Sequence, residues 1–306
     1  MVDIVLLGCG GTMPLKDRWL TSAFIRCQKT GILIDCGEGT QIAAAQQHIS
    51  RSSIDVILLT HFHADHVSGL PGLLLTMGNE GRTEPVDIYG PEGISSVIPA
   101  LCILVTLPFE VRLHELHEDA GLQTVCRIDS LCIEAFPVVH RIPCFGFRLT
   151  LSRCGKFNPE RARELNIPVY LWGELQKNET ATGPDGTVYR AADVLGAPRR
   201  GISVLYSTDT RPNGQLEQAM QGCDLAIIEG MFGDDEKRER AAETMHMTFP
   251  EAAFMAARAK PARVWLTHFS PSLPDPETYL PDVQQIYPAI ELGFSGKSLN
   301  LRYPED

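Results

Sequence analysis

The sequence predicts a layered α/β fold whose functional side chains gather at one edge of a sheet. Four short runs rich in branched apolar residues have the length of buried strands, and helix-like stretches separate them. Each run is followed closely by a histidine or an aspartate, and in layered α/β folds functional side chains gather where strands end. The four runs are residues 54–59, 131–136, 202–206 and 263–266.

Length and composition allow one large domain or two ordinary ones. The chain has 306 residues, 44% of them hydrophobic, and a formal net charge of −11. This charge argues against a general basic coating for nucleic acid, but it leaves room for a local basic surface.

Cysteine usage and hydropathy bear on location. Nine cysteines, with no C-x-x-C pair, indicate reduced thiols rather than a disulfide framework. The first residues lack a basic segment followed by a long apolar core, so no signal peptide is expected. The longest apolar run, residues 97–109, is interrupted by two prolines and a threonine, and it falls short of the roughly 20 residues that a membrane span needs. We therefore expect a soluble cytoplasmic protein without membrane contact.

The first elements are predicted from residues 4 to 48. Residues 4–7 indicate a strand that runs into a glycine-rich turn, but no dinucleotide or Walker pattern follows, so the phosphate-binding signal is weak. A hairpin at 23–27 and 32–35 and a helix at about 41–48 come next. Asp35, at the end of the hairpin, could orient a metal-bound histidine or serve an ordinary turn.

Residues 60–69 hold the strongest functional signal. Three histidines and an aspartate fall within six positions, directly after a predicted strand. Because alternate side chains of an extended segment share a side, His61 and His63 can face one metal ion. Asp65 and His66 follow where the chain begins to turn, and they can reach a second ion. Zinc accepts these ligands, as do manganese, iron and cobalt; a polar loop would explain one histidine but explains three beside an aspartate poorly.

The middle of the chain continues the alternation of helix and strand. The predicted elements are a buried helix at 70–77, a strand at 86–89, a turn at 90–93 and a helix that reaches 104. Residues 111–116 alternate apolar and polar positions, which is typical of a half-exposed strand. His114 and His117 are expected on a solvated surface, without a functional role.

The later strand runs each deliver one further metal-capable residue. His140, Asp209 and His268 follow the second, third and fourth of the four runs. Taken singly, each could be an ordinary loop residue, but their recurrence at strand ends indicates that they converge. Together with the cluster at 61–66 they make seven candidate ligands, enough for two metal ions with Asp209 as a bridge.

These residues resemble the metallo-β-lactamase fold, and within it the ribonuclease Z family, over nearly the whole length. The pattern H-x-H-x-D-H at 61–66 is followed by a single histidine, aspartate and histidine after later strands. The segments that carry the resemblance to ribonuclease Z most specifically are 35–41, 61–72, 207–211 and 266–270. The resemblance implies an αβ/βα sandwich of two mixed sheets flanked by helices. It also implies one domain, 1–306, with a substrate-arm insertion at about 151–200.

The resemblance implies two zinc ions per subunit, although manganese or another divalent metal could replace zinc. One ion would be held by His61, His63 and His140, the other by Asp65, His66 and His268, with Asp209 bridging them. Two such ions roughly 3.5–4 Å apart can generate hydroxide and neutralise the charge of a phosphoryl transition state.

Catalytic roles follow from the same resemblance. Asp65 is similar to the family residue proposed as general base. Glu229 matches the glutamate of the H-E-A-T motif, and with His246 it would protonate the departing 3′ oxygen. On the residues alone, His246 could be only a loop residue before a helix, and Glu229 only a charge at a strand end.

Substrate contacts are implied by two loops. The P-x-K-x-R loop appears with Lys16 and Arg18, and the H-x-T loop ends at Thr248, so these three residues would contact the tRNA. Residues 248–251 also form a capping box, which predicts a helix to about residue 259.

The implied activity is that of an endoribonuclease that removes the 3′ trailer of precursor tRNA and leaves a 3′-OH on the tRNA. Family members are homodimers in which the arm of one subunit serves the other's active site. Residues 151–200 hold eight Lys/Arg against six Asp/Glu, a basic excess suited to RNA phosphates, and residues 183–186 predict a hairpin turn.

Departures from the family pattern keep alternatives open. Residues 167–170 stand where the arm's Gly-Pro motif is usual, and Trp19 replaces an asparagine. The first alternative is a related metal-dependent phosphodiesterase acting on smaller or other phosphodiesters. The second alternative is a metal-binding but inactive relative that serves as an interaction protein. Thiolester or lactam hydrolysis is also open to the fold, but the cations of the P-x-K-x-R loop favour a phosphate-bearing substrate.

Overall fold

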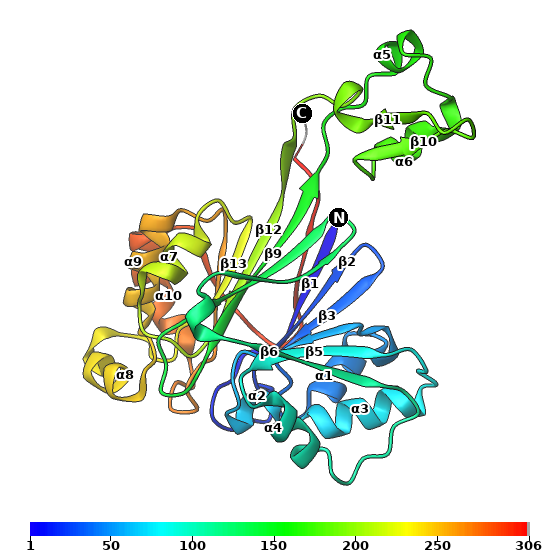
Figure 1. Cartoon of the computed structure of the whole chain (residues 1–306). Coiled ribbons are helices and arrows are strands. Elements are labelled where there is room, and N and C mark those ends of the chain that lie inside the picture. Colours follow the sequence, from blue (N-terminus) through cyan, green and yellow to red (C-terminus); the bar gives the residue numbers. More distant parts are fainter. Residues whose placement is uncertain (305–306) are drawn as a thin grey trace.

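The computed structural model describes residues 1–304 and shows two seven-stranded mixed sheets packed face to face (Figure 1). The first sheet has the strand order β16-β1-β2-β3-β4-β5-β6, and the second has the order β15-β14-β13-β12-β9-β8-β7. This is the predicted sandwich of two mixed sheets flanked by helices. Within residues 1–304, no helix is both long enough and apolar enough to cross a lipid bilayer. The last two residues of the predicted domain lie outside the described part.

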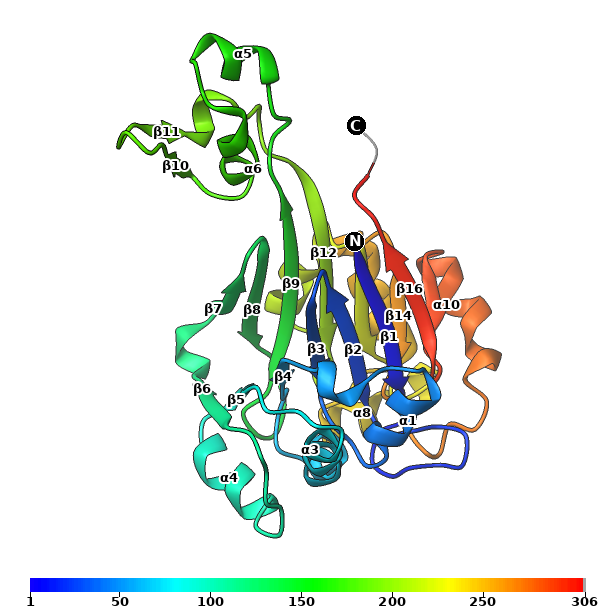
Figure 2. The same cartoon turned by 90° about the vertical axis from the view of Figure 1, so that its right-hand side faces the viewer.

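The first sheet is covered on its outer face by α1, α3 and α4 (Figure 2). Its strands are β1 (Val2–Gly8), β2 (Ser22–Cys27), β3 (Thr30–Ile34), β4 (Val56–Leu58), β5 (Val86–Pro91), β6 (Val111–Leu116) and β16 (Lys297–Leu301). The helices of this half are α1 (Thr40–Gln46), α2 (Ala64–Val67), α3 (Leu70–Asn79) and α4 (Ile94–Leu101). Ile57 and Ile88 point from the sheet into a cluster with Leu73 and Leu74 of α3, all fully buried, so the outer face of this sheet is as apolar as its inner face.

The second sheet carries α7, α9 and α10 on its outer face (Figure 1). Its strands are β7 (Gln123–Ile128), β8 (Leu131–Pro137), β9 (Phe145–Arg153), β12 (Arg199–Ser207), β13 (Leu225–Glu229), β14 (Val264–Thr267) and β15 (Ile290–Leu292). The helices are α7 (Gly214–Met220), α8 (Arg238–Thr244), α9 (Phe249–Ala259) and α10 (Leu280–Ile286). All five residues of β13 are buried, because the strand is covered on both faces, and this explains its apolar sequence from Leu225 to Ile228.

Between β9 and β12 the chain forms a separate lobe, which we call the arm (residues 154–198). It contains α5 (Pro159–Glu164), α6 (Trp172–Leu175), β10 (Thr180–Thr182) and β11 (Val188–Arg190), and it stands away from the sandwich (Figure 2). The arm has its own apolar cluster, in which Ala162 and Leu175 are fully buried. The turn at 183–186 joins β10 to β11, and Gly186 has a φ of +85°, a conformation that suits glycine.

The arm joins the sandwich through a narrow stalk. A Cβ at Gly155 would lie 1.9 Å from the carbonyl oxygen of Gly196. The two segments of the stalk therefore approach so closely that only glycine fits at position 155. The C-terminal segment supports the base of the stalk, because the Tyr303 hydroxyl donates to the Ser152 carbonyl at 3.0 Å. The arm is therefore held at a defined place above the sheets.

Several predicted boundaries differ from the structure, and three of them are instructive. The strand expected at 54–59 is limited to β4 (Val56–Leu58), and the helix expected to reach 104 ends at Leu101. The strand expected to stop at 89 continues through Gly90 and Pro91, which pair with Glu115 and Leu116 of β6. Cross-strand pairing thus overrides the local turn preference of the Gly-Pro sequence.

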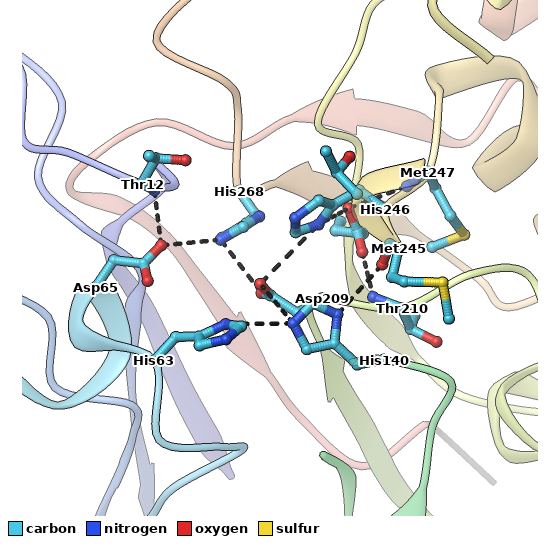
Figure 3. Close-up of polar contacts among 12 residues, drawn as sticks. Thr12, His63, Asp65, His140, Asp209, Thr210, Met245, His246, Met247 and His268 are labelled. Carbon is cyan, nitrogen blue, oxygen red and sulfur yellow. Dashed lines mark hydrogen bonds and ion pairs between the residues drawn. The ribbon is translucent and has the colours of Figure 1, made fainter. Parts of the chain in front are cut away.

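The strands that precede the candidate site residues end at one edge of the sandwich. β12, β13 and β14 run parallel, and β8 runs in the same direction because both β8 and β12 are antiparallel to β9. Beyond their carboxyl ends follow His140, Asp209 and His268, which lie close to His63 and Asp65 from the loop after β4 (Figure 3). The recurrence of His and Asp after strands is therefore one spatial cluster.

Candidate active site

The first group of candidate ligands combines the loop after β4 with the loop after β8. Nε2 of His61 lies 3.0 Å from Nδ1 of His63, and Nε2 of His140 lies 3.3 Å from the same Nδ1. His61 is fully buried, the His140 side chain is 1% exposed, and His63 is partly buried. Three ring nitrogens thus converge on one point; the sequence spacing predicted this for His61 and His63, and the family resemblance implied it for His140.

The second group joins α2 to the residue after β14. Nε2 of His66 lies 3.3 Å from Nε2 of His268, and Oδ2 of Asp65 lies 3.5 Å from the same His268 nitrogen. The backbone N–H of Thr12 donates to Asp65 Oδ2 at 2.6 Å, which fixes the carboxylate (Figure 3). This group has the composition that the family resemblance implies.

Asp209, after β12, lies between the two groups. Its Oδ1 is 3.1 Å from Nε2 of His66 and 3.2 Å from Nε2 of His268. Its Oδ2 faces the other group, 3.7 Å from Nε2 of His61 and 3.9 Å from Nε2 of His140. One carboxylate oxygen is therefore directed at each group.

The backbone at these positions takes an uncommon conformation. Asp35, Asp209 and His268 have φ values of +56°, +46° and +59°, which for residues other than glycine cost of order 1–3 kcal/mol each. The left-handed turn lets the chain leave the strand sharply and aim the side chain along the sheet edge. Gly11 makes room for one of them, because a Cβ there would lie 2.7 Å from the His268 ring.

Asp35 orients the histidines from behind. Its Oδ2 lies 2.8 Å from Nδ1 of His66, and its Oδ1 accepts from the Thr60 backbone N–H at 2.8 Å. The Thr60 hydroxyl lies 2.9 Å from the same carboxylate oxygen and 3.0 Å from Nδ1 of His61. A carboxylate that holds the far nitrogen of a ligand histidine sets its tautomer and ring plane, so the structure favours the orienting role over an ordinary turn.

The electrostatics of the cluster suit a cation. Burial lowers the pKa of His61 well below its usual value, so this imidazole is neutral and its lone pair is free. Burial also disfavours a charged His66, but the Asp209 and Asp35 carboxylates outweigh it and raise the pKa of His66 well above its usual value. The carboxylates of the cluster therefore favour positive charge beside them, either as a proton or as a metal ion.

Unpartnered atoms give a direct test of whether a metal fits. Asp209 is 2% exposed, yet its Oδ1 has no hydrogen bond of acceptable geometry in the described part of the chain, and His268 Nδ1 also has none. A buried carboxylate is costly unless positive charge lies beside it. Imidazole nitrogens and carboxylate oxygens are donors for divalent metals, and here they converge within 4.8 Å of one another in each group. The residues therefore fit a divalent metal.

Glu229 and His246 form a pair beside the candidate ligands. Oε2 of Glu229 lies 3.2 Å from Nδ1 of His246 and accepts from the Met247 N–H at 3.1 Å, while Oε1 accepts from the Thr210 N–H. Burial acts to lower the pKa of His246, but the Glu229 carboxylate outweighs it and raises that pKa. Because Nδ1 faces Glu229, Nε2 is the nitrogen that could give a proton to a substrate.

The predicted substrate-binding residues occupy different environments. Lys16 is exposed. The Arg18 guanidinium donates to the Leu273 carbonyl at 3.0 Å and lies 5.5 Å from the Phe269 ring centre. Thr248 is fully buried; its hydroxyl donates to Asp235 at 2.7 Å and accepts from the Glu251 N–H in the predicted capping box. Substrate contacts by these residues stay predictions.

Several residues of the site escaped the sequence analysis. Thr60 bridges Asp35 to His61, the Met245 carbonyl lies 3.3 Å from Nδ1 of His140, and Arg211 contacts the main chain of His246. Thr60 and Arg211 lie in segments that the sequence analysis marked, residues 60–69 and 207–211, but no role was assigned to either residue. Nothing in the sequence marks Met245, whose role is played by its backbone at a φ of +64°.

Comparison with known proteins agrees with this geometry. The family model described as Anti-Pycsar protein Apyc1 matches residues 2–102, and the Beta-lactamase superfamily domain matches residues 187–269. Ribonuclease Z of Agathobacter rectalis is 47% identical, and that of Lachnoclostridium phytofermentans is 44% identical, each over 100% of both chains. The crystal structure of human tRNase Z, short form, has a TM-score of 0.71 at 24% identity and covers 98% of this chain and 99% of that chain.

Fold and site together define a protein of the metallo-β-lactamase fold with a His/Asp centre for a divalent metal. Within that class, full-length similarity to its relatives is decisive, and the chain belongs to the ribonuclease Z family.

Asp35→Ala should weaken metal binding without unfolding the protein. Loss of the carboxylate that orients His66 is expected to lower zinc affinity about 10- to 100-fold, measured by titration against a competing chelator. Asp87→Ala is the matched control, because Asp87 lies 2.8 Å from His114 away from the site. Unchanged affinity in the Asp35 variant would remove its orienting role.

Proposed function

We propose that this protein hydrolyses the phosphodiester that joins the 3′ trailer to precursor tRNA and leaves a 3′-OH on the tRNA. The observation that carries the proposal is the convergence of seven candidate ligands and a Glu–His pair at one sheet edge of a ribonuclease Z family member. Water is added across the P–O3′ bond, so the trailer would leave with the phosphate.

Two zinc ions are the proposed cofactor, with manganese or another divalent ion as a substitute. The proposed ligands are His61, His63 and His140 for one ion, Asp65, His66 and His268 for the other, and Asp209 for both. Bound there, the ions would supply hydroxide at neutral pH and neutralise charge on the phosphoryl group. Asp35, Thr60 and the Met245 carbonyl would hold the imidazoles in place.

Proton transfers are assigned to two places. Burial acts to raise the pKa of Asp65, but His268 and His66 outweigh it and lower that pKa, so the side chain is ionised. The role of proton acceptor from the attacking water is assigned to it by the family resemblance. His246, oriented by Glu229, would give a proton to the departing O3′. The two residues would thus serve opposite faces of the phosphodiester.

The arm and the loop at 14–18 are proposed to hold the RNA. The arm region 151–200 has a net basic excess within an acidic chain, and phosphate contacts supply sequence-independent affinity. Lys16 is exposed and would contact a phosphate directly. Arg18 would act mainly by holding the loop against residues 270–274, and Thr248 through the placement of His246.

We further propose that the protein is a cytoplasmic homodimer. All nine cysteines are free thiols, which suits a reducing compartment. The arm leaves the sandwich where β12 begins, whereas Asp209 follows the end of β12 (Figure 1). The arm therefore points away from the site of its own subunit, and a second subunit could use it.

The decisive experiment is incubation with a precursor tRNA that carries a 3′ trailer, followed by mapping of the cut. Cleavage is expected at the trailer junction, leaving a 3′-OH, and Asp65→Ala should abolish it while leaving the thermal unfolding midpoint nearly unchanged. A wild-type rate in the Asp65 variant would overturn the role of this residue. Hydrolysis of a small phosphodiester without cleavage of the RNA would support the alternative phosphodiesterase, which the missing Gly-Pro motif of the arm favours.

Removing the arm should separate RNA binding from chemistry. Arg153 and Arg199 are cross-strand partners, so residues 154–198 can be replaced by an Asn-Gly turn. The dissociation constant for precursor tRNA should rise at least about tenfold, or ~1.4 kcal/mol, whereas hydrolysis of bis(p-nitrophenyl) phosphate should stay near wild type. Equal losses on both substrates would make the arm structural.

The dimer proposal is tested at the exposed apolar segment that follows α4. Ile103 and Leu104 are 80% and 94% exposed, an arrangement that marks candidate interfaces when apolar residues adjoin. Leu104→Glu should shift the protein from dimer to monomer in sedimentation velocity. Phe254→Glu, at a 54% exposed position on α9, is the control that should stay dimeric; an unaltered Leu104 variant would exclude this surface.

A further inference from the structure

Arg211 ties together three segments on the His246 side of the site. Its Nη1 donates to the His246 carbonyl, and its two Nη groups donate to the two carboxylate oxygens of Glu251, with Nη1–Oε2 at 2.9 Å. Its backbone N–H donates to the Val139 carbonyl at 3.0 Å, directly before His140. The backbone and side chain of this one residue therefore join the end of β12 to the loop after β8, to the main chain of His246 and to the start of α9.

These contacts need the shape of a guanidinium. The Arg211 side chain is 19% exposed and that of Glu251 is 5% exposed, so the pair is shielded from water. A planar fork can serve both carboxylate oxygens and a carbonyl at once, whereas a lysine ammonium is a single point charge. Arg211 is thus built into the structure rather than displayed to solvent.

The main chain at His246 depends on these contacts. The imidazole is held by Glu229 at Nδ1, and the His246 N–H donates to the Ala241 carbonyl at 2.8 Å. The carbonyl of His246 is the remaining backbone group, and Arg211 holds it. Without that contact the loop between α8 and α9 could shift, and Nε2 of His246 would move with it.

We propose that Arg211 is a positioning residue for departure of the leaving group: it fixes the backbone of His246 so that the imidazole meets the departing O3′. The proposal rests on the proposed function, in which His246 gives the proton that O3′ needs to leave as a hydroxyl. Arg211 itself transfers no proton and contacts no ligand atom of the proposed metal centre in the described structure.

The protein should fold without this side chain. Glu251 would keep the Thr248 N–H at 3.1 Å and the Arg238 guanidinium at 3.4 Å, so its carboxylate stays compensated. Arg211→Met and Arg211→Lys are therefore usable variants, and Arg211→Lys retains the charge if the Met variant is unstable.

The test compares two leaving groups. With Arg211→Met, kcat for precursor tRNA should fall about 10²-fold at unchanged KM, the scale expected when a catalytic group is misplaced by an ångström. Hydrolysis of bis(p-nitrophenyl) phosphate should change less than about threefold, because nitrophenolate departs without the proton that general acid catalysis supplies. For Arg211→Lys, kcat for precursor tRNA should lie between the values of the wild type and of Arg211→Met. Arg258→Met is the control, because Arg258 lies on the exposed face of α9 and pairs with Glu217 of α7. This variant should behave as wild type.

A double-mutant cycle then separates the inference from the proposed function. His246→Ala should show the same dependence on leaving group, and adding Arg211→Met to it should cause little further loss on precursor tRNA. The positioning role of Arg211 would be overturned by any of three outcomes: additive losses of activity in the double variant, equal losses of activity on both substrates, or a raised KM with unchanged kcat. If His246→Ala alone cleaves precursor tRNA normally, the acid assignment fails, and a full Arg211→Met loss in that background refutes the inference independently.

Discussion

The structure is organised around a carboxylate that is buried among imidazoles. Asp209 is 2% exposed and lies within 3.1–3.9 Å of ring nitrogens of five histidines. A charge in such a place is tolerated only if positive charge compensates it. This single requirement explains why strands from both sheets end at the same edge, and why strained backbone is kept at Asp35, Asp209 and His268.

Around this centre, the histidine side chains are held in place by neighbouring hydrogen-bonding groups. Thr60 and Asp35 restrain the histidines of the β4 loop, the Met245 carbonyl restrains His140, and Glu229 restrains His246. These restraints come from elements that are distant in sequence but adjacent at the sheet edge. Rigid placement of this kind is what an active site needs for in-line chemistry, where small displacements cost large factors in rate.

The sequence predicted the candidate metal ligands better than the residues that hold these ligands in place. Alternation along an extended segment indicated that His61 and His63 share a side, and the recurrence of His140, Asp209 and His268 after strands indicated convergence. Apolar runs identified the strands, whereas the pairing of two sheets came from the family resemblance. The structure brings all seven candidate ligands together in the predicted groups.

What the sequence could not reveal depends on long-range contacts. The backbone acceptor at Met245 has no side-chain signature, and the room that Gly11 leaves for His268 is visible only once β1 and β14 are adjacent. Arg18 looks like a free cation in the sequence, but its guanidinium is engaged by the carbonyls of residues 270–274. Pairing with β6 likewise extends β5 through a Gly-Pro turn signal.

The length of β12 has a consequence for which molecules can touch the arm and the catalytic edge together. The strand spans nine residues from Arg199 at the stalk to Ser207 beside the centre, and at about 3.3 Å per residue this separates the two by roughly 25–30 Å. A mononucleotide is far too small to bridge that span, whereas a folded RNA is not. Within one subunit, a molecule the size of a mononucleotide therefore cannot contact the arm and the His/Asp cluster at the same time.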